Sequence, residues 1–168
     1  MLSFNLFTRR RMKEKNIWQL YVDGGARGNP GPAGAGIVIS KNNTLILSVG
    51  YFLGIKTNNQ AEYLALLIGL FFLIKKFHVN DEIRIFADSN LMVQQINGKY
   101  KVKNLVLLQF CYAAKYLLQE INYSMHYIPR EENVYADLMV NHGIDSRREL
   151  PKEFKDFLGN YEASLFKK

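Results

Sequence analysis

The chain has 168 residues, of which 48% are hydrophobic and 22% charged, so it can form one globular domain with a sizeable core. The longest apolar stretch, Leu64 to Ile74, is too short to cross a bilayer, and the first residues lack the order of a secretory signal peptide. We therefore expect no membrane partner. The single cysteine, Cys111, excludes an intramolecular disulfide and fits the reducing cytoplasm, where we expect a monomer.

The net charge is +7, and much of it lies at the start of the chain, where residues 9–15 hold five cations and one acid. We expect residues 1–15 to form a flexible basic arm ahead of a single domain over residues 16–146. A basic surface favours a polyanionic partner, although a soluble basic protein without such a partner has the same composition.

Three strands are predicted at the start of the domain, over residues 17–23, 35–40 and 45–53, where β-branched and aromatic residues are enriched. The stretch GARGNPGPAG between the first two is predicted to be a turn, because glycine and proline interrupt strands. The segment KNN forms a hairpin connection between the second and the third. Three consecutive strands with short links predict an antiparallel meander.

Helices and strands alternate in the rest of the chain. Apolar periodicity predicts helices over residues 59–77, 89–96, 105–119 and 133–144, and strands over residues 82–88 and 123–128. Within residues 147–168, an amphipathic helix or a tail is expected over residues 150–165. Strands that are reached through helices run parallel to the strand they join, so we predict a three-layer α/β fold. It has a mixed five-stranded sheet with helices on both faces, and its aromatic residues are expected on core faces rather than in a stacking platform.

Four acidic residues stand where this fold can bring them together. Asp23 and Asp88 end predicted strands that are parallel neighbours, and Glu62 and Asp137 lie early in helices that begin near the same edge. Mg²⁺ takes oxygen ligands from a few carboxylates, and two such ions can bind the attacking and the leaving oxygen of a phosphodiester. The pattern therefore predicts a catalytic metal site.

Each of these acids also fits a structural role when it is taken alone. Asp23 precedes two glycines, as a turn aspartate does, and Glu62 has the capping-box spacing from Asn59. Asp88 is placed to cap the next helix, and Asp137 to face the positive end of its own helix. These alternatives stay open, but they do not require the four acids to share one edge of the sheet.

Four segments resemble, in order and in spacing, the motifs of the type 1 ribonuclease H family: YVDGGARGNPGPAGAGIVI, TNNQAEY, FADSN and IPREENVYAD. The resemblance extends from about Trp18 to Ile144. It implies a ribonuclease H-like fold and a Mg²⁺-dependent endonuclease that cuts the RNA strand of RNA–DNA hybrids, leaving 5′-phosphate and 3′-hydroxyl. Mn²⁺ is a possible substitute metal.

The resemblance also assigns roles to individual residues. It implies that one ion lies between Asp23 and Asp137 and a second among Asp23, Glu62 and Asp88. Further residues are implied as substrate contacts, by motif position or by charge: Gly24, Asn29, Asn58, Asn59, Ser89, Asn90, Lys99, Lys101, Lys103 and Arg130.

Two departures from the family pattern affect this list. The loop before Asp137 has no histidine, so Arg130 is the nearest candidate to replace it. The family's basic protruding helix is missing, and the short segment GKYKVKN with its three lysines is a modest substitute. The missing protrusion keeps open a relaxed nuclease that also cuts double-stranded RNA. A non-catalytic hybrid-binding module is the other alternative, although a binder gains nothing from clustered acids.

Overall fold

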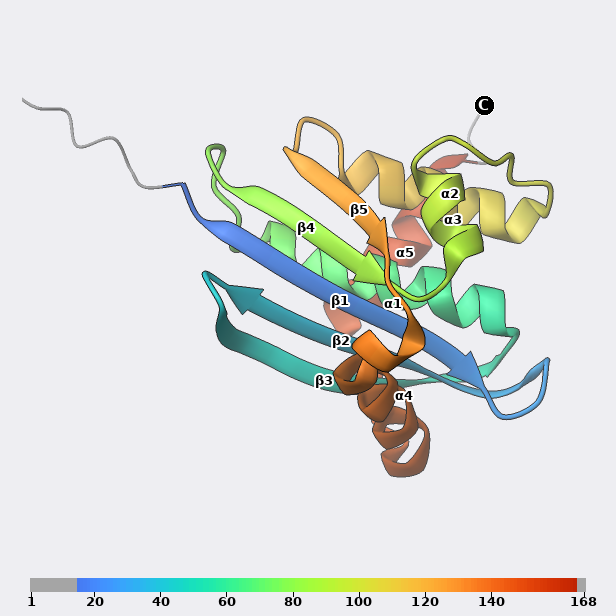
Figure 1. Cartoon of the computed structure of the whole chain (residues 1–168). Coiled ribbons are helices and arrows are strands. Elements are labelled where there is room, and N and C mark those ends of the chain that lie inside the picture. Colours follow the sequence, from blue (N-terminus) through green and yellow to red (C-terminus); the bar gives the residue numbers. More distant parts are fainter. Residues whose placement is uncertain (1–14, 166–168) are drawn as a thin grey trace, which may run out of the picture.

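The structure is a computed structural model that describes residues 15–165, with side chains described up to residue 161. Residues 1–14 of the predicted arm lie outside the described residues, and the predicted division into arm, domain and tail stays a prediction. The elements are labelled in Figure 1 and have these bounds: β1 (Ile17–Ala26), β2 (Gly31–Lys41), β3 (Thr44–Lys56), α1 (Asn58–Ile74), β4 (Glu82–Ala87), α2 (Asn90–Ile96), α3 (Leu105–Leu117), β5 (Tyr123–Tyr127), the short 3-10 helix η1 (Arg130–Glu132), α4 (Val134–Ser146) and α5 (Lys152–Leu165).

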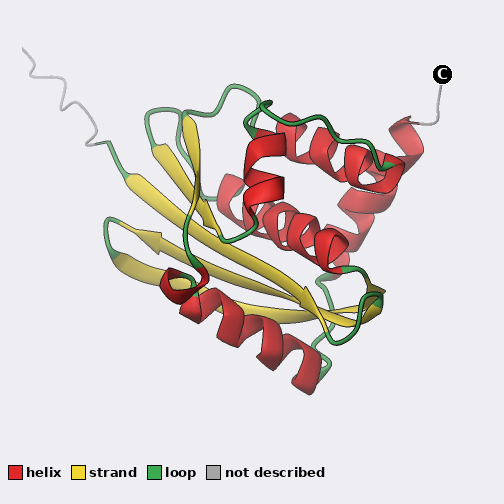
Figure 2. Cartoon of the chain, turned by 45° about the vertical axis from the view of Figure 1, so that its right-hand side comes forward, coloured by secondary structure: helices red, strands yellow, loops and turns green. Residues whose placement is uncertain are grey.

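The strands form one five-stranded sheet in the order β3-β2-β1-β4-β5. β1, β2 and β3 pair antiparallel as the predicted meander, whereas β4 is parallel to both β1 and β5. Among the described residues, α4 lies on one face of the sheet, and α1, α2, α3 and α5 lie on the opposite face (Figures 1 and 2). The predicted three-layer α/β fold is confirmed.

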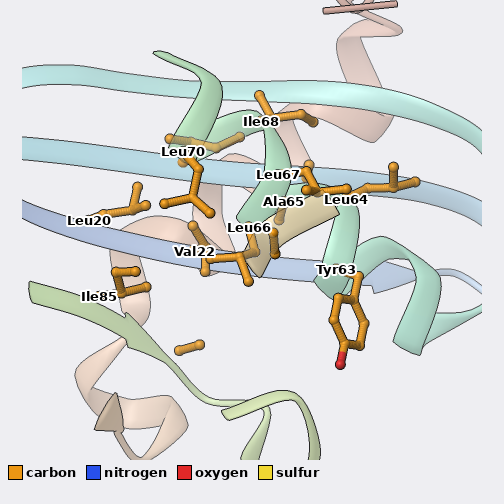
Figure 3. Close-up of a cluster of buried hydrophobic side chains, with 14 of the residues drawn as sticks. Leu20, Val22, Tyr63, Leu64, Ala65, Leu66, Leu67, Ile68, Leu70 and Ile85 are labelled. Atoms are coloured by element: carbon orange, nitrogen blue, oxygen red, sulfur yellow. The ribbon is translucent and has the colours of Figure 1, made fainter. Parts of the chain in front are cut away.

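The main core lies between the sheet and α1. This helix is apolar on nearly all sides because β1, β2 and α3 all pack on it. Figure 3 shows Leu66 of α1 among the side chains of Val22 and Ile85, and all three are fully buried. The predicted C-terminal helix is α5, whose Phe154 is also fully buried and contacts Phe71 of α1 edge to face, with ring centroids 5.5 Å apart. Among the described residues, no helix is long and apolar enough to span a membrane.

The predicted ten-residue turn between the first two strands is wrong in extent. β1 continues to Ala26 and β2 begins at Gly31, so that only residues 27–30 connect them. Gly34 and Gly36 of β2 are needed for packing: a Cβ on Gly34 would lie 2.5 Å from the carbonyl oxygen of Val140, and one on Gly36 would lie 1.9 Å from that of Ala136, both in α4. The glycines thus let the backbone of α4 approach the sheet, and Asp23 lies inside β1 rather than at its end.

Candidate active site

Three of the four predicted acids form a compact cluster. Carboxylate oxygens of Asp23, Glu62 and Asp88 all lie within 4.8 Å of one another. Val22 of β1 is opposite Ala87, the last residue of the parallel strand β4, so the residue that follows each of them places a carboxylate at the same point of the sheet. The parallel pairing of β1 and β4 therefore brings Asp23 and Asp88 together.

Glu62 reaches this cluster because α1 packs directly on β1. A Cβ on Gly24 would lie 2.2 Å from the backbone nitrogen of Glu62, so only glycine allows this contact. Gly24 was predicted as a substrate contact, and it is buried between the strand and the helix at the floor of the site.

The structure excludes three of the four structural alternatives for these acids. The capping box of α1 is formed by Thr57 and Gln60, not by Asn59 and Glu62. Ser89 caps α2 in place of Asp88, and its hydroxyl accepts from the backbone N–H of Met92. Asp23 lies in a strand and not in a turn. None of these three carboxylates therefore serves as a helix cap or as a turn residue.

Burial and like charge make this cluster unfavourable as three ionised groups. Burial, and next the nearby Asp88 and Asp137, raise the pKa of Asp23 from 3.8 to about 7. Burial, and next Asp23 and Asp88, raise the pKa of Glu62 well above its ordinary value. The Oε2 atom of Glu62 is buried and has no hydrogen-bond partner among the described residues. Three converging carboxylates with an unpartnered buried oxygen fit a hard divalent cation, which would relieve the repulsion.

The fourth acid has a different environment. Asp137 lies in the first turn of α4, as predicted, and its side chain is 26% exposed. Its Oδ1 accepts a hydrogen bond of 2.5 Å from the guanidinium of Arg130, which lies on η1, and this bond raises the pKa of Arg130. Asp137 lines the same cleft as the three clustered acids but is not one of the group that converges within 4.8 Å.

The cleft above the acids has a volume of about 540 Å³. Predicted residues at its wall include Asn58 and Arg130. The Oδ1 of Asn58 accepts from the backbone N–H of Ala26 at 2.9 Å, and the Oδ1 of Asn29 accepts from the backbone N–H of Asn58 at 3.0 Å. These two amides tie the β1–β2 connection to the start of α1, and the neighbouring Asn59 is exposed there.

The remaining predicted substrate residues lie outside the residues that line the cleft. Asn90 is exposed, and its Oδ1 accepts from the side-chain amide of Gln94. The three lysines are exposed in the connection between α2 and α3: Lys99, Lys101 and Lys103. The carbonyl of Lys101 accepts a hydrogen bond of 3.4 Å from Gln95, which itself accepts from the buried hydroxyl of Tyr63.

Two residues at the site were not predicted. Arg27 lines the cleft and is held by Asp145 of α4 at 2.6 Å. Arg27 is the one cation in the glycine-rich stretch, and this position shortly after Asp23 could have marked it as a candidate site residue. Asn133 is 1% exposed, and its Nδ2 donates to the carbonyl of Val22 at 2.9 Å and to Oδ1 of Asp88 at 3.0 Å. No sequence pattern indicated that this amide holds a carboxylate of the cluster.

Comparison with known proteins identifies relatives of this fold and site. The sequence model of the family described as "Reverse transcriptase-like" matches residues 21–143. The bifunctional protein Rv2228c of Mycobacterium tuberculosis is 39% identical over 130 residues, which are 74% of this chain and 35% of that protein. Ribonuclease HI of Halobacterium salinarum is 35% identical over 127 residues, which are 74% of this chain and 63% of that protein. The chain thus spans less than two thirds of either relative.

Solved structures cover the chain in a similar way. RNase H1 of Halobacterium salinarum NRC-1 has a TM-score of 0.73 at 32% identity, covering 77% of this chain and 98% of that one. LC11-RNase H1, solved in complex with an RNA/DNA hybrid, has a TM-score of 0.72 at 39% identity, covering 79% of this chain and 98% of that one. The chain therefore belongs to the reverse transcriptase-like family, and its fold is that of the type 1 ribonucleases H.

Proposed function

We propose that the protein is a metal-dependent endoribonuclease that hydrolyses the RNA strand of RNA–DNA hybrids. The observation that carries this proposal is the cluster of Asp23, Glu62 and Asp88, whose carboxylate oxygens lie within 4.8 Å of one another at the base of a cleft. A protein that only binds nucleic acid would gain nothing from three converging, mutually repelling acids. The relation to LC11-RNase H1, which was solved with an RNA/DNA hybrid, supports the choice of substrate.

The three clustered acids would hold a divalent ion, which we propose to be Mg²⁺, with Mn²⁺ as a substitute. Asp137 would share a second ion with Asp23 after its carboxylate gives up the bond to Arg130. When bound, such ions lower the pKa of water and neutralise charge on the reacting phosphodiester. Hydrolysis would leave 5′-phosphate and 3′-hydroxyl.

The chain's own residues prepare the site and hold the substrate. The amide of Asn133 orients Asp88 toward the cluster, and the absence of a side chain at Gly24 keeps Glu62 close to the strand. Arg27 and Arg130 at the cleft wall would bind phosphates of the substrate. To do so, Arg27 would release the carboxylate of Asp145, and Arg130 that of Asp137.

The amides of Asn29, Asn58 and Asn59 would contact the minor groove of the hybrid, where the 2′-hydroxyl distinguishes RNA from DNA. Ser89, Asn90 and the three lysines would make further contacts along the strands. We propose in addition that the protein works as a monomer in the cytoplasm.

Cleavage of defined duplexes tests the proposal. We expect an end-labelled RNA–DNA hybrid to be cut in its RNA strand with Mg²⁺ or Mn²⁺, and a single 2′-deoxy nucleotide at the cut site to block cleavage there. Comparable cutting of double-stranded RNA would identify the relaxed nuclease. Equal cutting of a DNA duplex would contradict hybrid specificity, and tight binding of the hybrid without any cutting would identify a binding module.

A further inference from the structure

The face of the sheet that carries the acid cluster is only partly covered. Helix α4 packs mainly on β2 and β3 and touches β1 less, and in Figure 1 no helix of the described residues crosses β4 or β5 on this face. Side chains alternate between the two faces of a strand, so Tyr21 lies on the same face as Asp23, and Phe86 on the same face as Asp88. The open face therefore continues directly from the acid cluster along β1 and β4.

Three rings form a continuous stack across this open face. Tyr21 of β1 is opposite Phe86 of β4, which is opposite His126 of β5. The ring centroids of Tyr21 and Phe86 are 4.7 Å apart with an interplanar angle of 19°, and those of Phe86 and His126 are 5.5 Å apart with an angle of 26°. The expectation that the aromatic residues occupy core faces is wrong for Tyr21 and Phe86, because neither points toward α1.

This ring stack follows the spacing of the strands, which is about 4.8 Å. The faces of each ring therefore point toward the neighbouring strands. A further ring can be added to the stack where the side chain of the next strand is small. On the β2 side of Tyr21, the residue opposite is Val38, whose side chain is too short to form another ring layer.

A cavity of about 380 Å³ borders this part of the sheet. Tyr21, Val38 and Tyr135 of α4 line it, together with the polar residues Gln19, Ser40 and Glu132. The hydroxyl of Ser40 donates to Oε1 of Gln19 at 3.0 Å, which orients the Gln19 amide beside the cavity. The volume is in the range of sites for small ligands, about 300–1,000 Å³, and the lining combines an aromatic wall with donors and acceptors.

The cavity is also connected to the acid cluster. Asn133 lines the cavity and donates to the carboxylate of Asp88 at 3.0 Å. Tyr21 precedes Asp23 by two residues, which corresponds to about 7 Å along a strand. A group bound in the cavity would therefore lie beside any nucleic acid held at the cluster.

We propose that this cavity binds a single unpaired nucleobase, which continues the stack of Tyr21, Phe86 and His126 by one ring. Stacking on an aromatic side chain accepts every base, because each base has a π-face. The polar groups of Gln19, Ser40 and Glu132 would meet the edge of the base. The base can belong to a free mononucleotide or to an unpaired nucleotide at the end of a bound duplex, and the second source rests on the proposed function.

The test compares binding of four ligands by the full chain in EDTA, which prevents cleavage. They are a blunt hybrid, the same hybrid with a short unpaired tail on either strand, the tailed hybrid with abasic sugars in the tail, and adenosine or uridine monophosphate alone. The variant Val38→Phe fills the cavity with a ring of the chain itself. Ser48→Phe is the matched control, because Ser48 is opposite Val38 on β3, on the same face but outside the cavity lining.

We expect a tail with bases to improve affinity about tenfold over the blunt and the abasic hybrids, which corresponds to about 1.4 kcal/mol. Val38→Phe should abolish this gain and leave the affinity for the blunt hybrid unchanged, whereas Ser48→Phe should keep the gain. Binding of a mononucleotide alone, abolished in Val38→Phe, would support the proposal with a free nucleotide as the source. If Val38→Phe does not fold, as judged by thermal melting, Tyr21→Leu removes the aromatic wall and should have the same effect.

The proposal is overturned if neither a tail base nor a mononucleotide binds better than the abasic control, or if the gain persists in Val38→Phe or Tyr21→Leu. Cleavage of the blunt hybrid by the parent protein with Mg²⁺ reports separately on the proposed function, so a failure of one is distinguishable from a failure of the other.

Discussion

The cluster of Asp23, Glu62 and Asp88 and the pair of Arg130 and Asp137 line one cleft but hold their charges in opposite ways. In the cluster, burial and mutual repulsion raise the pKa of two carboxyls. In the pair, a guanidinium neutralises a carboxylate that is partly in solvent. The cluster is held in place by packing and by Asn133, and no cation forms an ion pair with it among the described residues, whereas the pair already has such a partner and can exchange it.

The largest effect that tests this comparison is on catalysis. We expect Asp88→Asn to leave the fold intact and to lower hybrid cleavage about a thousandfold or more, because an amide cannot offset the charge of a divalent ion that contributes several kcal/mol to the transition state. Single-turnover cleavage with Mg²⁺ measures this loss, and the same result is expected for Asp23→Asn. Asp156→Asn, which removes an exposed acid of α5, is the control and should retain full activity. Activity of either cluster variant within tenfold of the parent would contradict the assignment.

The second effect is on the stability of the metal-free protein. Because the pKa of Asp23 is about 7 in the folded state against 3.8 ordinarily, the folded state binds more protons than the unfolded state between these pH values. The free energy of unfolding should therefore fall as pH rises from about 4 to about 7, by on the order of a few kcal/mol, and then level off. Glu62 acts in the same direction.

Asp88→Asn removes one source of this repulsion. In EDTA near pH 8 the variant should melt at a higher temperature than the parent, although it is inactive, and its stability should depend less on pH. Mg²⁺ at a hundredfold excess over its dissociation constant should stabilise the parent by about 2.7 kcal/mol and the variant by less. A lower melting temperature of the variant in EDTA, or equal stabilisation of both proteins by Mg²⁺, would show that the acids do not share a metal site.

The sequence predicted the cluster better than the pair, and the reason is physical. Asp23 and Asp88 follow apolar runs of neighbouring parallel strands, and this regular pairing can be inferred from the order of strands and helices. The bond of Arg130 to Asp137 depends on a single 3-10 turn, and no periodic pattern indicates how such a turn directs a side chain.

Long-range packing explains the other differences. Gly34 of β2 was interpreted as a turn residue because α4, the helix that it accommodates, follows about a hundred residues later in the chain. Asn133 contacts Val22 across 111 positions, so its role follows only from the tertiary structure. The capping box expected from Asn59 and Glu62 lies two residues beyond the observed one, which Thr57 and Gln60 form. Local patterns thus predicted the elements, whereas contacts between distant segments determined the details of the site.

A third and smaller effect should separate the two roles of Arg130. In Arg130→Gln, the carboxylate of Asp137 loses its counter-charge, so Mg²⁺ should bind the free protein several-fold more tightly, as measured by calorimetry. Stability should change by less than about 1 kcal/mol, because the Arg130 side chain is 73% exposed. Turnover should fall about tenfold, because a charged group that binds phosphate is removed. Arg130→Lys keeps the charge without the planar fork and should be intermediate in both measurements. Unchanged metal affinity and turnover in Arg130→Gln would show that the pair is only a surface ion pair.

The smallest effect is expected in the lysine connection between α2 and α3. Its backbone is anchored by Gln95 at Lys101, and Val102 packs against the core, while Lys99, Lys101 and Lys103 remain exposed. If these amines meet phosphates of the hybrid, replacing all three by alanine should reduce the slope of log affinity against log salt by about 0.7–0.9 for each phosphate that the protein no longer neutralises. Cleavage at saturating substrate should stay the same, because the lysines lie outside the cleft lining.

Replacing the exposed Lys76, Lys115 and Lys152 lowers the net charge equally and serves as the control. An equal change of slope in both triple variants would mean that the connection contributes only through overall charge, and that the arginines at the cleft bind the phosphates locally.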